Sequence, residues 1–233
     1  MKKRWISVLA ALLLAGCGRQ ETIIPETTAV LTMQTAATEP SETTETVPME
    51  PEEEAFVRIL DYIPEAEQEL FYATDRNFTG ERIYGFEDAY LRYGTVKKLM
   101  AVSAELAESG LFLKIWDGFR PTAAQFRLWE VCPDSRYVSN PEKGFSSHSR
   151  GNTVDLTLVD ENGQELVMPT GFDDFSSKAD RDYADCTQEE RENALLLQNM
   201  MEKHGFKGYA GEWWHYSDVE SYPVEEAYYP PVG

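Results

Sequence analysis

Two segments far apart in the sequence each carry a histidine close to a carboxylate. The first, over residues 146–155, contains His148 and Asp155, and the second contains Glu212 and His215. A catalytic zinc ion usually takes three imidazole or carboxylate ligands and leaves its fourth position to water. His148, Asp155 and His215 would supply that set. The fold must therefore bring distant parts of the chain together around one ion.

Glu212 is the carboxylate that this ligand set leaves over. A carboxylate beside a metal-bound water accepts the proton of that water in many hydrolases, so the pattern predicts metal-assisted hydrolysis. Side chains alternate along a strand, so Glu212 and His215 would point to opposite faces of a regular one. Their joint role requires a bulge or a position at a strand end. Two imidazoles argue against calcium, and a structural zinc would need a fourth protein ligand.

The first 16 residues are typical of a secretory signal peptide. Basic residues at positions 2–4 precede a short apolar run, which suits a signal and is too short for a permanent membrane span. Residues 14–17 resemble a lipobox, which predicts cleavage before Cys17 and lipidation of that cysteine. We therefore expect a lipid-anchored protein at the extracytoplasmic face of a bacterial membrane. An ordinary signal peptide with an incidental cysteine is the alternative.

Residues 17–55 are rich in Thr, Glu and Pro, and they predict a disordered tether. A folded interaction module is the alternative, but no helical or strand periodicity supports it. The net charge of −20 argues against nucleic acid or anionic lipid as a partner. Residues 56–233 form the predicted catalytic domain, and a hydrophobic content of 42% suffices for one core.

This domain is predicted to be α+β, with a small, mostly antiparallel sheet and flanking helices. Apolar periodicity and capping residues predict the helices, and short β-rich runs predict the strands. The expected helices cover residues 96–106, 121–129 and 187–204, and the expected strands cover 111–116, 153–159, 165–168 and 211–216. His204 would close the last helix in a structural role. Cys132 and Cys186 could form a disulfide or remain separate thiols.

The two histidine segments resemble the zinc signature of the D-alanyl-D-alanine dipeptidase and D,D-carboxypeptidase family. Further blocks resemble the dipeptidases in the expected order, and together they cover the chain from about residue 56 to its end. These blocks are residues 72–74 with 77–80, 116–121, 146–158, 172–173 and 212–216. Thr153 departs from the family pattern, which has alanine there.

The resemblance implies one zinc ion per chain on His148, Asp155 and His215, with Glu212 as the general base. It also implies that Arg120 stabilises the oxyanion, a role that suits a guanidinium. Asp173 would bind the free ammonium of a dipeptide, with Ser146 and Tyr72 as further pocket residues. The alternatives are a surface ion pair for Arg120, a solvated turn for Asp173, core packing for Tyr72, and core positions for Trp213 and Trp214.

The expected function is hydrolysis of D-Ala-D-Ala or similar D,D-dipeptides, in cell-wall turnover or scavenging. A role in antibiotic resistance would require access to the cytoplasm, which an external lipoprotein lacks. One alternative is a D,D-carboxypeptidase that trims peptidoglycan stem peptides. Another is a catalytically silent, wall-binding lipoprotein, although binding alone needs neither Glu212 nor Arg120. The oligomeric state stays open.

Overall fold

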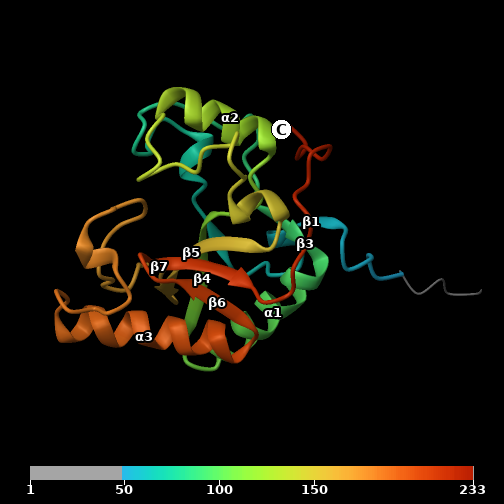
Figure 1. Ribbon diagram of the computed structural model, residues 1–233. Coiled ribbons are helices and arrows are strands. Elements are labelled where there is room, and N and C mark those ends of the chain that lie inside the picture. The colour runs from blue at the N-terminus through green and yellow to red at the C-terminus, as the bar shows by residue number, and fades with distance from the viewer. Residues whose placement is uncertain (1–48, 233) are drawn as a thin grey trace, which may run out of the picture. The chain divides into compact units, whose positions relative to one another are not determined.

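The computed structural model describes residues 49–232 (Figure 1). The predicted signal peptide, Cys17 and the predicted tether as far as residue 48 lie outside these described residues. The last residues before the predicted domain are hydrogen-bonded to it, because the carbonyls of Glu53 and Ala55 accept bonds from Gly94 and Tyr93. No helix within residues 49–232 is long and apolar enough to cross a membrane.

A five-stranded sheet in the order β2-β4-β5-β7-β6 forms the centre of the domain. β2 pairs parallel with β4 and the other pairs are antiparallel, so the α+β prediction with a mostly antiparallel sheet is confirmed. β1 and β3 form a separate antiparallel pair. The strands are β1 (Phe56–Arg58), β2 (Glu67–Gln68), β3 (Tyr90–Arg92), β4 (Leu111–Asp117), β5 (Thr153–Asp160), β6 (Phe206–Tyr209) and β7 (Glu212–Asp218).

Three α-helices are described: α1 (Tyr93–Ala107), α2 (Thr122–Val131) and α3 (Gln188–Lys203). In Figure 1, α1 and α3 lie on one side of the sheet and α2 on the other. Val154, Leu156 and Leu158 alternate along β5 and are fully buried in the core that α1 and α3 cover. Because side chains alternate along a strand, Asp155 points to the opposite face. That face carries the candidate site.

Local sequence signals account for several helix ends. Thr187 caps α3 and forms a reciprocal capping box with Glu190. Gly110 follows α1 with a φ of 71°, a left-handed conformation that glycine adopts without strain. His204 lies at the end of α3, and its Nε2 is 2.9 Å from a carboxylate oxygen of Glu105 in α1. This is the structural position expected for His204.

The predicted strand over residues 165–168 is wrong. It is reduced to a single bridge between Glu165 and Val159, plus a hydrogen bond from the Leu166 amide to the Leu158 carbonyl. Pro169 follows, and proline has no N–H to extend a ladder. Cys132 and Cys186 are both free thiols, so the disulfide that the sequence left open is not formed.

Candidate active site

The register of β4 shifts where it reaches the site. Ile115 pairs with Leu156, but Asp117 pairs with Asp155, so one extra residue of β4 is accommodated between them. In a regular strand Asp117 would face the apolar core. The shift turns it to the face that carries Asp155, where a buried charge has polar partners.

A larger irregularity lies in β7. Asp155 pairs with His215 across β5 and β7, which puts both side chains on one face. On the other side of β7, Gly208 pairs with Tyr216 while the next residue, Tyr209, pairs with Glu212. β7 therefore has three extra residues, 213–215, opposite two consecutive residues of β6. This is the bulge that the joint role of Glu212 and His215 required.

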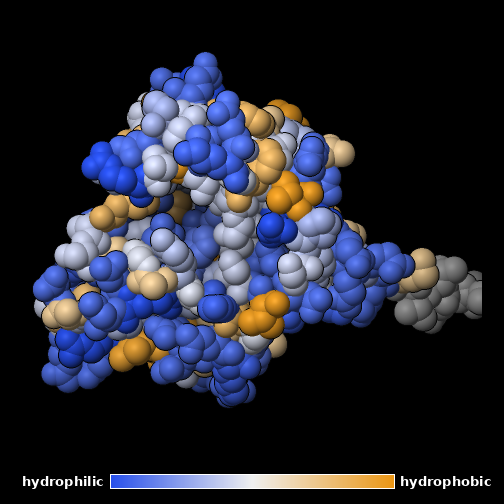
Figure 2. Space-filling view, viewed as in Figure 1, coloured by the Kyte–Doolittle hydropathy of each residue, from blue (hydrophilic) through white to orange (hydrophobic). Residues whose placement is uncertain are grey.

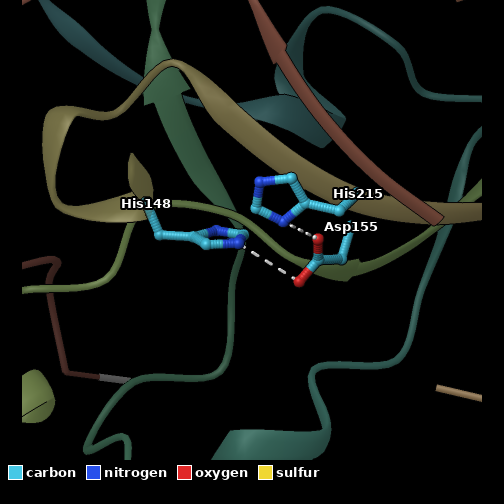
Figure 3. Close-up of side chains that lie close together, drawn as sticks. All are labelled: His148, Asp155 and His215. Carbon is cyan, nitrogen blue, oxygen red and sulfur yellow. Dashed lines mark ion pairs between the residues drawn. The ribbon is translucent and has the colours of Figure 1, made fainter. Parts of the chain in front are cut away.

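The three predicted metal ligands converge at this point (Figure 3). The Nε2 atom of His148 lies 3.2 Å from one oxygen of Asp155, and Nδ1 of His215 lies 3.0 Å from the other. The possible ligand atoms of these residues all lie within 4.8 Å of one another. Glu212 lies beside them, with Oε2 3.4 Å from Nδ1 of His215.

The chemistry of the donor set fits a zinc ion. Oδ1 of Asp155 is buried without a hydrogen-bond partner although Nδ1 of His215 lies 3.0 Å away, and a cation bound by both atoms would satisfy them. Burial alone would raise the pKa of Asp155, but the imidazoles of His148 and His215 lower it below its usual range. The carboxylate is therefore ionised, as a metal ligand must be.

The position of His148 is determined by two backbone contacts. Its Nδ1 lies 2.8 Å from the Gly118 carbonyl, which only accepts, so Nδ1 carries the proton and Nε2 is left for a metal. Its backbone amide donates to the hydroxyl of Ser146, the N-cap of a short 3-10 helix over Ser147–Arg150. Ser146, predicted as a pocket residue, thus also orients a ligand. On the other side, Nε2 of His215 lies 3.3 Å from the Ser147 hydroxyl.

Arg120 is held by a buried polar network rather than exposed as a surface ion pair. Its Nη2 donates to Asp117 at 2.8 Å, its Nε to the Tyr84 hydroxyl at 3.1 Å, and its Nη1 to Gln125 at 3.3 Å. A guanidinium has five N–H donors, so one donor remains on each terminal nitrogen. Arg120 also lines the cavity of the site.

The hydroxyl of the buried Tyr72 donates a hydrogen bond of 2.8 Å to the carboxylate of the half-buried Asp173. Asp173 has a φ of 55°, a conformation that few residues other than glycine, asparagine and aspartate adopt. Burial raises the pKa of Asp173 to about 8; the negative charge of Asp155 adds to this rise, while the hydrogen bond from Tyr72 opposes it. Asp173 is therefore not the solvated turn considered as its alternative.

A cavity of about 320 Å³ joins these groups. It is lined by every predicted site residue of the described chain, and also by residues 135–139 and Phe175. Figure 2 shows this face hollowed between the parts that carry α2 and α3, with a largely hydrophilic surface. The volume lies at the low end for small-molecule sites, which suits a ligand of dipeptide size. Glu212 also lines this cavity, and burial there raises the pKa of its carboxyl group.

Some features of the site were missed or left open. Asp117 and Tyr84 had no predicted role. Asp117 belongs to the block over residues 116–121, and its signal is a charge at the end of a buried strand, whereas Tyr84 has no such signal. Trp213 and Trp214 are fully buried, which supports their interpretation as core aromatics. The hydroxyl of Thr153 bonds to Ser217 across β5 and β7 at 2.8 Å, so the departure from the family pattern is accommodated.

Comparisons with known proteins agree with the predicted family. The sequence model of the D-ala-D-ala dipeptidase family matches residues 52–230. The D-alanyl-D-alanine dipeptidase of Escherichia coli (strain K12) is 40% identical over 164 residues, which cover 69% of this chain and 84% of that protein. The dipeptidase of Enterococcus faecalis (strain ATCC 700802 / V583) is 34% identical over 179 residues, covering 68% of this chain and 88% of that protein.

Among solved structures, a vancomycin-resistance D,D-pentapeptidase in complex with Zn(II) is similar, at 16% identity and a TM-score of 0.38. The aligned region covers 57% of this chain and 74% of the pentapeptidase chain. The family assignment rests on the match of the family model to residues 52–230 and on the two similar dipeptidases, which cover 69% and 68% of this chain. The chain belongs to the D-Ala-D-Ala dipeptidase family and is a zinc metallopeptidase.

Proposed function

We propose that this protein hydrolyses D-Ala-D-Ala or closely similar D,D-dipeptides at the outer face of a bacterial membrane, in wall turnover or scavenging. The observation that carries the proposal is the pair formed by Asp173 and Tyr72 inside the cavity of the three ligands. Asp173 lies close to the reacting centre, and the positive charge of a substrate ammonium next to the scissile bond would favour its ionised form over the protonated form that burial favours. A stem peptide has no such ammonium.

In the proposed reaction Glu212 moves the proton. Zinc bound at His148, Asp155 and His215 supplies a Lewis acid that polarises oxygen and makes water more acidic. Glu212 accepts a proton from the attacking water and then delivers it to the amine nitrogen that leaves. Its raised pKa suits a group that must both accept and return a proton near neutral pH.

Arg120 is proposed to stabilise the negative charge that develops on the carbonyl oxygen. Its two remaining N–H donors form a fork, and the network of Asp117, Tyr84 and Gln125 holds that fork in place before substrate arrives. A preorganised donor of this kind costs little reorganisation during the reaction. The cation also offsets part of the negative charge of the cavity.

The test compares three substrates with the full-length, zinc-loaded protein. We expect rapid hydrolysis of free D-Ala-D-Ala, and little hydrolysis of N-acetyl-D-Ala-D-Ala or L-Ala-L-Ala. Asp173→Asn should slow hydrolysis of the free dipeptide and so reduce the difference in rate between the free and the acetylated peptide. Equal rates on both D,D-peptides would favour a carboxypeptidase. Binding of peptidoglycan by a zinc-loaded protein that cleaves none of them would indicate the silent wall-binding protein.

The location is proposed from the N-terminal sequence alone. A lipobox ending at Cys17 and a long polar segment before the domain would hold the enzyme outside the membrane. Cells expressing the full-length protein and fed radiolabelled palmitate should label the wild type and leave Cys17→Ser unlabelled. Labelling of both proteins, or of neither, would contradict lipidation at Cys17.

A further inference from the structure

The bulge that brings Glu212 and His215 together leaves backbone groups of β7 without strand partners. β5 pairs with β7 only as far as His215, and β6 skips from Tyr216 to Glu212. The carbonyls between these points need other donors, because a buried carbonyl without one is costly. A single side chain donates to three of the β7 carbonyls in this region, those of Glu212, Trp213 and His215.

That side chain is Arg181, from the segment before α3. Its Nη2 donates to the carbonyls of Trp213 and His215 at 2.9 and 3.0 Å. Its Nε donates to the carbonyls of Tyr209 and Glu212 at 2.8 and 3.2 Å. Its Nη1 lies 3.2 Å from the Tyr216 hydroxyl. The guanidinium therefore contacts both strands and both ends of the bulge.

A backbone hydrogen bond and the absence of a neighbouring side chain hold the guanidinium in this position. The backbone amide of Arg181 donates to the Ala210 carbonyl at 2.9 Å, in the turn between β6 and β7. Gly208 gives the guanidinium its room, since a Cβ at that position would lie 2.6 Å from Nη2 and closer still to Cζ. Any larger residue at position 208 would push the guanidinium away from the bulge.

We infer that Arg181 is a positioning residue, which sets the distance and orientation between the general base Glu212 and the metal ligand His215. This inference rests on the proposed roles of those two residues. Arg181 accomplishes this through their backbone carbonyls and touches no reacting atom. Lysine would not replace it, because an ammonium cannot span carbonyls on two strands as a planar fork does.

The test uses the full-length protein with Arg181→Lys and, as a matched control, Arg191→Lys. Arg191 also donates to a backbone carbonyl, that of Tyr183 at 2.9 Å, but it lies on α3 outside the bulge. We expect Arg181→Lys to weaken zinc binding about 10–100-fold in competition with a chelator, as loss of an outer support does for other metal sites. The kcat for D-Ala-D-Ala should fall about 100-fold, the effect of a small misplacement, with KM unchanged. Arg191→Lys should change neither quantity.

A role in stability alone would give a different result. Arg181→Lys would then unfold at lower denaturant but keep the zinc affinity and kcat of the wild type when folded, which would overturn the inference. Zinc affinity is read without substrate, so a weakened affinity supports the inference even if the protein cleaves no dipeptide. If the wild type hydrolyses D-Ala-D-Ala and Arg181→Lys has the same zinc affinity and the same rate, the inference about Arg181 is refuted. The proposed function would then still stand.

Gly208→Ala provides a second variant that keeps the guanidinium but displaces it. It should weaken zinc binding in the wild type and have much less effect in an Arg181→Met background, because the group that the methyl displaces is then absent. Independent, additive effects of the two substitutions would show that the glycine acts on something other than Arg181, against the inference.

Discussion

Replacing Asp117 by asparagine tests whether a buried ion pair supports Arg120. Both side chains are buried, Asp117 completely, and they approach to 2.8 Å. The Asp117 oxygens also accept from the Tyr84 hydroxyl, at 2.8 and 3.0 Å, and from the Gly118 amide at 2.8 Å. Asparagine removes the charge and turns one acceptor into a donor. The Arg120 cation then lacks its partner, and one buried donor faces another.

Breaking a buried ion pair by removing one partner costs about 3–5 kcal/mol. Asparagine keeps one oxygen as acceptor, so we expect the low end, a loss of about 3 kcal/mol in the free energy of unfolding. With a urea slope of about 2 kcal/mol/M, the midpoint of unfolding should fall by roughly 1.5 M. The measurement is made without zinc, because metal bound to the folded state would add its own stabilisation.

Arg58 and Asp61 form the matched control, an ion pair with the same spacing in the chain and an approach of 2.9 Å, but exposed to solvent. Asp61→Asn should leave the urea midpoint near the wild-type value, since exposed pairs contribute little. With zinc added, Asp117→Asn should also lose about 100-fold or more in kcat if Arg120 stabilises the oxyanion. Equal midpoints for the two variants would refute the reasoning about burial.

Three further outcomes are expected. Glu212→Gln should retain zinc, measured by metal content, and lose about 10²–10⁴-fold in kcat, since the base is removed and the ligands remain; loss of zinc would make Glu212 a ligand. Asp173→Asn should become more stable relative to the wild type as pH rises from about 4 to 8. In that window the folded wild type holds a proton that the unfolded chain has released, so its stability falls with pH; urea unfolding of metal-free protein at both ends of the window measures this, and a constant difference would contradict it. Tyr72→Phe should raise the pKa of Asp173 further, because the hydrogen bond from Tyr72 lowers it; a carboxyl NMR titration that shows no upward shift would count against the pairing.

Much of the fold could be predicted from local signals. The helix ending before Gly110, the capped helix after Thr187 and the buried strand before Asp160 all have strong periodicity or a specific end signal. The helix signals are local because helix caps and helix hydrogen bonds join near neighbours, and the strand signal is the apolar composition of the run itself. β6 was missed because it has only four residues, between Gly205 and the turn that contains Gly211. The strand over residues 165–168 was predicted because an apparent hairpin turn precedes it. Pro169 has no N–H, so the ladder does not extend beyond the first residues.

The candidate ligands were predictable because imidazole and carboxylate side chains are the groups that a catalytic zinc ion binds. The groups that hold them were not. Asp117 faces the site only because β4 shifts its register, and no property of residues 111–117 alone specifies that shift. The role of Arg181 is even harder to predict from the sequence than that of Asp117. Its partners are mostly backbone carbonyls, which every residue carries. Positions that serve backbone geometry leave little trace in a single sequence.

The two register shifts and the chemistry of the site are connected. A regular antiparallel sheet sends alternate side chains to opposite faces, so it cannot gather Asp117, Glu212 and His215 on the face of Asp155. The shifts solve this, but they leave backbone groups without strand partners. Arg181 then binds the carbonyls freed in β7, while just beyond β4 the Gly118 carbonyl accepts from His148. The contacts that satisfy the irregular backbone are therefore the contacts that orient the ligands. It follows that substitutions restoring a regular ladder should stabilise the sheet and weaken zinc binding together.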